Sequence, residues 1–229
     1  MKHRFYVPLE LKAGEAVTLA GEEFHHAARV VRVRAGEEVE VFDGHGNAAA
    51  GIVDALERQH AIVTLRERIA SRESVHAIHL AMAIIQLEKF ELVLQKATEL
   101  GVRSILPLVT ERVELRPERY RGKADRWNRI VFEATKQCGR AMIPIVESPI
   151  AFEEAVKRDG AKILFDADAP ADPPTSEETA TLFIGPEGGW SEDELALARA
   201  QGCAFAQLGI RRLRAETAAI VACARHMDI

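Results

Sequence analysis

The chain has 229 residues, of which 48% are hydrophobic and 28% charged, proportions that are ordinary for a folded globular protein. No apolar run approaches the roughly 18–20 residues that a membrane-spanning helix needs, so an integral membrane protein is not expected. The formal net charge is −5, so the overall charge gives no support for nucleic-acid binding.

The N-terminal part of the chain favours short β-strands. Residues 37–42 alternate polar and apolar side chains, and the sequence DGHGN at 43–47 is a hairpin signal. Residues 61–68 are another strand candidate. The Arg-Val-Arg sequence at 32–34 also alternates, so its two arginines are expected on one strand face. We predict a small β-barrel over residues 1–70.

From residue 75 onward, strand-like apolar runs alternate with amphipathic helical runs. This alternation is typical of an α/β domain with a mainly parallel sheet flanked by helices, here over residues 75–229. The strands are predicted at 76–85, 104–109, 143–146, 162–166, 181–185 and 205–209. The helices are predicted at 87–100, 124–138, 151–158, 191–200 and 215–227. A proline-rich acidic segment at 166–178 is predicted to be a surface loop.

The sequence GPEGG at 185–189 lies between the end of a predicted strand and the start of a predicted helix. Open α/β sheets bind ligands at that edge, and glycines let the backbone approach a ligand closely. The stretch is neither a P-loop nor G-x-G-x-x-G, and Glu187 with the acids at 192–194 would repel a polyphosphate. A neutral or cationic ligand held by main-chain groups fits better, and a turn required only for packing is the alternative.

A second glycine-containing stretch, LGIRRLRAETA at 208–218, follows the last predicted strand. Arg211, Arg212 and Arg214 crowd the start of the last helix, where positive charge is unfavourable beside the helix dipole. That cost indicates an anionic partner or a functional role, although Glu216 could simply pair with one of the arginines.

Four segments together resemble a known enzyme family: IGPEGGWSEDE, LGIRRLRAETA, QKATELGV at 95–102 and FEATKQCGR at 132–140. Over nearly its whole length the chain resembles the RsmE family, the 16S ribosomal RNA uridine N3-methyltransferases of the SPOUT class. Residues 25–44 are similar to that family's PUA-like barrel. The chain departs from the family's usual residues at four positions, which leaves individual contacts open: Gln86, Val113, Arg212 and Ala215.

The resemblance implies a SPOUT fold, in which the C-terminal segment forms a trefoil knot, preceded by a PUA-like small β-barrel that binds RNA. It also implies S-adenosyl-L-methionine as the cofactor, held mainly by main-chain groups of the knot loops. The implied cofactor-binding residues are Leu164, Ile184, Gly185, Gly188, Leu208, Gly209 and Leu213.

The implied activity is methylation of N3 of a uridine in 16S rRNA, by the resemblance uridine 1498, within the assembled 30S subunit. Arg214 is expected to stabilise negative charge on the uracil, and Glu216 to orient Arg214 or to accept the proton. Arg140 is expected to reach the RNA from the partner subunit of a homodimer. The residues expected to bind RNA are Arg4, Arg29, Arg32, Arg34 and Arg112.

Two other classes of function stay open on the sequence. A non-catalytic RNA-binding protein on the same scaffold predicts a damaged cofactor loop, whereas GPEGG is intact. A nucleotide-binding enzyme predicts a P-loop or G-x-G-x-x-G after an early strand. The N-terminus does not resemble a signal peptide, and Cys138, Cys203 and Cys223 form no CxxC pair. A cytoplasmic protein with reduced cysteines and no metal is therefore expected.

Overall fold

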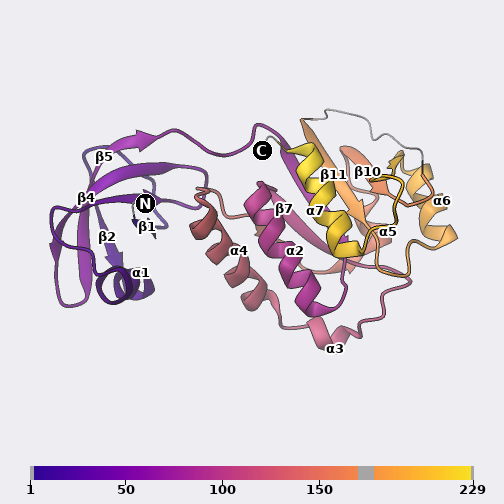
Figure 1. Ribbon diagram of the computed structural model, residues 1–229, viewed down its shortest axis with the longest axis horizontal. Helices are drawn as coiled ribbons and strands as arrows, with labels where there is room; N and C mark the ends of the chain where they lie inside the picture. The colour runs from indigo at the N-terminus through magenta and orange to yellow at the C-terminus, as the bar shows by residue number, and fades with distance from the viewer. Residues whose placement is uncertain (1–2, 170–177, 228–229) are drawn as a thin grey trace. The chain divides into compact units, whose positions relative to one another are not determined.

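The structure is a computed structural model that describes residues 3–169 and 178–227 (Figure 1). Most of the predicted acidic loop, residues 170–177, lies outside the described residues. Within residues 3–169 and 178–227, no helix is both long enough and apolar enough to cross a membrane. The chain divides into two compact units: unit 1 comprises Met1–Glu73 and Thr135–Ile143, and unit 2 comprises Ser74–Ala134 and Pro144–Ile229.

Unit 1 is built on a five-stranded sheet with the spatial order β1-β3-β4-β5-β2. The β3–β4 hairpin confirms the turn predicted at 43–47, in which Asp43 accepts two backbone hydrogen bonds. Register shifts between β4 and β5 bend the pair, as β-bulges do. Its strands are β1 (His3–Tyr6), β2 (Ala16–Ala20), β3 (Glu38–Phe42), β4 (Ala48–Leu56) and β5 (His60–Ile69).

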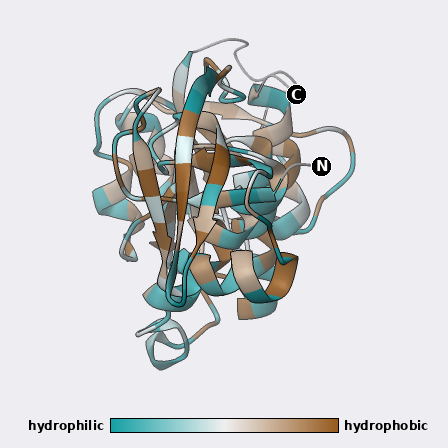
Figure 2. Ribbon diagram, turned by 90° about the vertical axis from the view of Figure 1, so that its left-hand side faces the viewer, coloured by the Kyte–Doolittle hydropathy of each residue, from teal (hydrophilic) through white to brown (hydrophobic). Residues whose placement is uncertain are grey.

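The core of unit 1 lies against one face of this sheet. Hydrophobic and hydrophilic bands alternate along the strands that face the viewer in Figure 2, because successive side chains of a strand point to opposite faces. Phe5, Val41 and Val63 are fully buried members of the resulting apolar cluster. The predicted N-terminal β-structure is thus a curled sheet around its own core.

One segment of unit 1 differs from its prediction. The short helix α1 (Gly21–His25) continues into the π-helix η1 (His26–Val31), and Arg32 then adopts a left-handed conformation with φ of 57°. The prediction that Arg32 and Arg34 share a strand face is therefore wrong. Alternation over only three residues was too short to specify a strand. Arg29, Arg32 and Arg34 are nevertheless all exposed on unit 1.

A buried polar cluster joins the two sequence segments of unit 1. The carboxylate of Glu73 accepts hydrogen bonds from the Arg140 guanidinium, at 2.8 and 3.0 Å, and from the backbone N–H groups of Ala141 and Met142. Only 4% of Arg140 is exposed. The structure therefore places Arg140 inside unit 1, where its charge is satisfied by Glu73, instead of on a surface that could face RNA.

Arg4 belongs to the same cluster. Its side chain is 11% exposed and forms an ion pair with Glu40. Its guanidinium also donates to the carbonyl oxygens of Thr135, Lys136 and Arg140, at 3.0 to 3.3 Å. These carbonyls lie in and just after the last turn of a helix, where a cation is favourable. Arg4 therefore has a structural role here, and we leave it and Arg140 out of the proposed functional residues.

Unit 2 contains a seven-stranded sheet with the main order β12-β10-β11-β6-β7-β8, and β9 also pairs with β7. The strand pairs of this sheet are parallel, which confirms the predicted α/β class. Its strands are β6 (Ala77–Ala83), β7 (Ser104–Val109), β8 (Ile145–Val146), β9 (Ile150–Ala151), β10 (Ala161–Phe165), β11 (Thr179–Ile184) and β12 (Ala204–Ala206).

Helices cover both faces of this sheet. On one face α5 and α6 pack against the strands through an apolar cluster that includes Phe152, Phe183 and Ala198. α2 and α7 pack against each other, and α7 lies along β11 and β6 (Figure 1). Phe183 and Ile184 point to opposite faces and both are buried. The helices are α2 (Leu87–Leu100), α3 (Pro117–Tyr120), α4 (Ala124–Cys138), α5 (Phe152–Ala155), α6 (Glu192–Ala200) and α7 (Ala215–His226).

Candidate functional site

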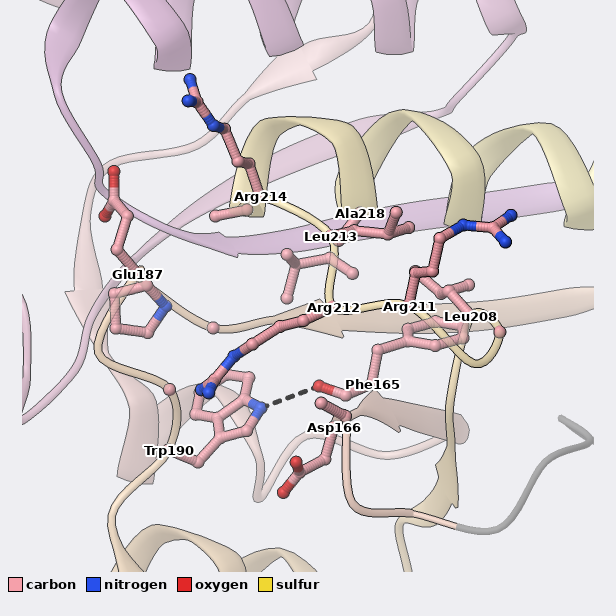
Figure 3. Close-up of a pocket in the computed structure, with 17 residues that line it drawn as sticks. Phe165, Asp166, Glu187, Trp190, Leu208, Arg211, Arg212, Leu213, Arg214 and Ala218 are labelled. Atoms are coloured by element: carbon pink, nitrogen blue, oxygen red, sulfur yellow. Dashed lines mark hydrogen bonds between the residues drawn. The ribbon is translucent and has the colours of Figure 1, made fainter.

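A cavity of about 390 Å³ lies at the carboxyl edge of the unit 2 sheet (Figure 3). The loops that follow β10, β11 and β12 form its walls, together with the first turn of α7. Its volume is in the range of small-molecule sites, and open parallel sheets bind ligands at this edge. The fold therefore brings the two glycine-containing stretches of the sequence to one place.

At Gly185 the backbone passes directly over the indole of Trp190. A Cβ atom at position 185 would lie 3.0 Å from ring atom Cε2, which is closer than normal contact. The indole Nε1 donates a hydrogen bond of 3.0 Å to the carbonyl oxygen of Phe165, and the Trp190 ring is buried. The indole thus connects the loop after β11 to the end of β10, and a side chain at position 185 would disturb that connection.

The rest of the glycine-rich loop turns the chain into α6. Gly189 has a φ of 70°, a conformation that side chains disfavour, and its N–H donates to the Pro186 carbonyl at 2.9 Å. The Ser191 hydroxyl then accepts from the Glu194 N–H, while the Glu194 carboxylate accepts from the Ser191 N–H. This reciprocal pair is a capping box, and α6 begins at the next residue.

The loop after β12 forms the opposite part of the lining. Gly209 has a φ of 128°, which again requires a residue without a side chain. The half-buried Leu208 and Leu213 line the cavity, and Leu213 lies in its middle in Figure 3. Ile210 projects from the same loop and is 94% exposed.

Charged side chains of both signs surround the cavity. Asp166 and Glu187 contribute two carboxylates, and Glu187 also forms an ion pair with Lys89 at 3.5 Å. Arg212 extends across the cavity toward Trp190 in Figure 3. Two further arginines of the lining, Arg211 and Arg214, belong to the same stretch. The two carboxylates are compatible with a cationic group of a ligand, and the three guanidinium groups with an anionic one.

The start of α7 carries the other ionisable groups near the cavity. Arg214 is the N-cap residue, and its side chain is exposed beside the cavity, on the side of Glu187 (Figure 3). Glu216 is partly buried, and its Oε2 atom has no hydrogen-bond partner among the described residues. A buried carboxylate oxygen without a donor is costly, so such an atom is a candidate for contact with a ligand or a reacting group.

Five of the seven residues expected to bind the cofactor line the cavity: Ile184, Gly185, Leu208, Gly209 and Leu213. Leu164 instead packs in the apolar cluster with α5 and α6. Gly188 lies in the glycine-rich loop but faces Arg112, whose guanidinium donates to its carbonyl oxygen at 3.0 Å. Arg214 lines the cavity, whereas Glu216, in the first turn of α7, is not among the lining residues.

Sequence reasoning did not single out Asp166 or Trp190, although both line the cavity. A signal was available for each. Asp166 directly follows a strand that ends at the same edge as GPEGG, and Trp190 directly follows the last glycine. A large aromatic residue directly after two glycines indicates that its ring fills the space that they leave.

The cysteines are not part of the cavity lining, and no metal cluster is found among the described residues. In residues 3–169 and 178–227, no group of histidine, cysteine, aspartate and glutamate could hold a metal ion. Cys138, Cys203 and Cys223 are thiols and form no disulfide with one another. Burial raises the pKa of the Cys223 thiol to about 12, so this cysteine stays protonated at neutral pH.

Comparison with known proteins agrees with this arrangement. Residues 71–227 match the RNA methyltransferase domain family, and residues 19–66 match the RNA methyltransferase PUA domain. The ribosomal RNA small subunit methyltransferase E of Synechocystis is 32% identical over 98% of this chain and 77% of its own length. The corresponding protein of Rickettsia conorii is 28% identical over 97% of this chain and 94% of its own length.

Solved structures extend the similarity to the whole fold. The ribosomal RNA small subunit methyltransferase E of Neisseria gonorrhoeae, bound to S-adenosyl methionine, has a TM-score of 0.89 at 32% identity and covers 98% of this chain and 96% of its own. A methyltransferase of Legionella pneumophila with bound SAM has a TM-score of 0.84 at 33% identity, covering 97% and 96%. The chain described here belongs to the ribosomal RNA small subunit methyltransferase E family.

Proposed function

We propose that this protein is an S-adenosylmethionine-dependent methyltransferase that methylates N3 of a uridine in 16S rRNA. The observation that carries the proposal is the cavity formed by three loops at the carboxyl ends of β10, β11 and β12. Family membership supports the reaction class, and two relatives of known structure carry the same cofactor. Uridine 1498 as the target and the assembled 30S subunit as the substrate remain predictions.

The residues of the cavity fit this cofactor. Gly185 and Gly209 expose main-chain groups at the lining, while Ile184, Leu208 and Leu213 supply apolar surface for an uncharged adenosine. The carboxylates of Asp166 and Glu187 are compatible with the positive charges of the donor. S-adenosylmethionine supplies, when bound, a methyl group on a sulfonium that an electron-rich nitrogen can attack.

Arg214 is the residue that we assign to the uracil base. N3 of uracil must lose its proton before its lone pair can attack, and negative charge then spreads over the two carbonyl oxygens. A guanidinium at the cavity edge stabilises that charge and lowers the pKa of N3. Arg214 lies there, exposed and fixed at the N-cap of α7. Holding the base in line with the methyl group supplies the rest of the acceleration.

Glu216 has two possible roles in this arrangement. Its buried Oε2 atom, which has no donor among the residues described, is available to accept a hydrogen bond from Arg214 and so to orient it. Alternatively, the same atom accepts the proton that leaves N3. A carboxylate without a partner is suited to either role, since each provides the missing donor.

For RNA binding we propose the exposed arginines of unit 1. Arg29, Arg32 and Arg34 lie in and just after η1, and the barrel segment matches the RNA methyltransferase PUA domain. If they contact phosphates, RNA affinity should fall steeply with salt, and the triple alanine variant should have a shallower dependence. A salt dependence unchanged by the three substitutions would remove them from the RNA-binding surface.

We further propose that the protein acts as a cytoplasmic homodimer. Ile210 is a large apolar side chain that is almost fully exposed on a loop of the cavity, and a second copy could cover it. The small residues Ala219 and Ala222 of α7 are buried within one chain, so they are not available to a second copy. Sedimentation analysis of the wild type and of Ile210→Asp tests the dimer.

Calorimetry separates the three classes of function. A methyltransferase binds S-adenosylmethionine and not ATP, a nucleotide-binding enzyme binds ATP, and a non-catalytic RNA-binding protein binds neither. Mass spectrometry of 16S rRNA, after incubation of 30S subunits with the protein and the cofactor, should then show 3-methyluridine. Donor binding with no methylated base would contradict the proposed reaction on 16S rRNA, whereas binding of neither ligand would favour the non-catalytic alternative.

A further inference from the structure

The segment at the end of β7 is in direct contact with the glycine-rich loop. Arg112 donates a hydrogen bond from its guanidinium to the Gly188 carbonyl oxygen at 3.0 Å. A Cβ atom at position 188 would lie 3.2 Å from the Arg112 Cβ, so the close approach depends on the glycine. The second glycine of GPEGG, Gly188, is therefore explained by Arg112 and does not need a ligand to account for it.

A second hydrogen bond, from Glu111, joins the segment after β7 to the start of α6. The backbone N–H of Glu111 donates to Oε1 of Glu194 at 2.9 Å, while Oε2 of Glu194 accepts from the Ser191 N–H at 2.9 Å. Glu194 is 3% exposed, so its carboxylate relies on these donors. One buried carboxylate thus ties the end of β7 to the start of α6, immediately after the glycine-rich loop.

We infer that Arg112 is a positioning residue for methyl-donor binding. It fixes the peptide between Gly188 and Gly189, with the help of Glu194, and thereby holds the lining at Gly185 and Glu187. The inference rests on the proposed function, and it replaces the expectation that Arg112 binds RNA. Glycine-rich segments lose much conformational entropy on ordering, so a loop fixed before the ligand arrives binds it more tightly.

The test measures donor affinity without RNA. Calorimetry with S-adenosylmethionine compares the wild type with Arg112→Ala, Arg112→Lys and Arg116→Ala. Arg116 is an exposed arginine on the same segment, so its loss removes the same charge and leaves the bond to Gly188 intact. We expect a Kd about threefold to tenfold higher for Arg112→Ala, since one hydrogen bond is lost. Arg112→Lys should recover part of that loss, and Arg116→Ala should match the wild type.

Kinetics and exchange separate positioning from a general loss of stability. In Arg112→Ala the KM for the donor should rise while kcat changes little, and amide hydrogen exchange of residues 185–189 should become faster than in Arg116→Ala. If Arg112→Ala fails to fold, Glu194→Gln takes its place. The glutamine amide keeps one of the two acceptor oxygens of Glu194 and loses the other, so one of the two hydrogen bonds is lost. We therefore expect the Kd for the donor to rise in this variant also.

Two results overturn the inference. One is an Arg112→Ala variant that binds the donor as tightly as the wild type. The other is a variant that loses affinity for RNA only, which would return Arg112 to the RNA-binding residues. A wild type that binds no donor contradicts the proposed function instead. The exchange rates of residues 185–189 then decide whether Arg112 holds the loop.

Discussion

Gly185 shows how a single residue type can be required by its neighbour. Its Cα lies against the Trp190 indole, and that indole holds the Phe165 carbonyl at the cavity edge. Gly189 and Gly209 are required for a different reason, since their φ values of 70° and 128° exclude most side chains. Gly188 is required by the approach of Arg112. Glycine is therefore required at this site for three different reasons: contact with Trp190, a positive φ, and contact with Arg112.

Substitution of Gly185 by alanine should weaken donor binding more than it weakens the fold. The added methyl group would lie 3.0 Å from Trp190, so the indole or the loop must move at the cavity wall. We expect the Kd for the donor to rise about tenfold or more, measured by calorimetry. Gly122→Ala is the control for a general loss of stability, because its φ of 73° disfavours a side chain while a Cβ there meets open space outside the cavity. Equal donor affinity in both variants would contradict this role of Gly185.

Substitution of Arg214 tests the mechanism at one guanidinium. Arg214→Ala should lower kcat by about 100-fold, since one stabilising donor is lost in the transition state, while the Kd for the donor stays near that of the wild type. If Glu216 acts only by orienting Arg214, adding Glu216→Gln to Arg214→Ala should cost little more. Single-turnover methylation of 30S subunits measures both effects. Undiminished methylation by Arg214→Ala would remove this residue from the mechanism.

At the scale of elements, α6 depends on its N-terminal cap. The Ser191 hydroxyl and the Glu194 carboxylate satisfy N–H groups that would otherwise lack partners at the helix start. Ser191→Ala should lower the free energy of unfolding by about 1 kcal/mol in urea denaturation. Ser191→Asp should retain most of the free energy of unfolding, because an aspartate side chain can also accept a hydrogen bond at an N-cap. A Ser191→Ala variant as stable as the wild type would show that the capping box contributes nothing.

The long elements of unit 2 could be predicted from the sequence because local signals agreed with tertiary packing. α2 begins and ends at its predicted residues, with Gly101 in the left-handed C-cap conformation, and α4 and β7 coincide with their predicted ranges. The glycine-rich loop was also placed correctly at a strand end. Strand and helix periodicities differ enough over ten or more residues to be read directly.

Shorter elements could not be predicted, since their structure depends on contacts distant in sequence. The helix predicted at 151–158 is shorter in the structure: Ala151 belongs to β9, which pairs with β7, and α5 ends at Ala155, before the turn at Gly160 that leads into β10. The π-helix η1 has no sequence signature of its own. The buried positions of Arg4 and Arg140 depend on the partners Glu40 and Glu73, which no local pattern indicates.

At the scale of the whole molecule, unit 1 is discontinuous in sequence. Residues 135–143 belong to it, although the strand and helix alternation assigned them to the second domain. Their carbonyl and N–H groups are bound by Arg4 and Glu73. The barrel thus uses the end of α4 as part of its own structure.

Removal of that second segment should therefore destabilise the barrel. A fragment ending at Glu73 leaves the Glu73 carboxylate without Arg140 and the N–H groups of Ala141 and Met142, and removal of one partner of a buried ion pair is strongly destabilising. Arg4 keeps Glu40 but loses its carbonyl acceptors in residues 135–140. We expect this fragment to be unfolded or to melt well below the full-length protein by circular dichroism. In the full chain, Glu73→Ala should lower the free energy of unfolding by about 3 kcal/mol, because it removes the carboxylate that pairs with the buried Arg140. A fragment with native-like cooperative melting would show that the segment is dispensable.

The central claim is that the three loops at the carboxyl edge of the unit 2 sheet hold the methyl donor. A crystal structure of the protein with S-adenosylmethionine tests it most directly. We predict density for the donor between Trp190, Leu208 and Leu213, with main-chain contacts at Gly185 and Gly209. Density on the sheet of unit 1, or an empty cavity at a saturating donor concentration, would contradict it.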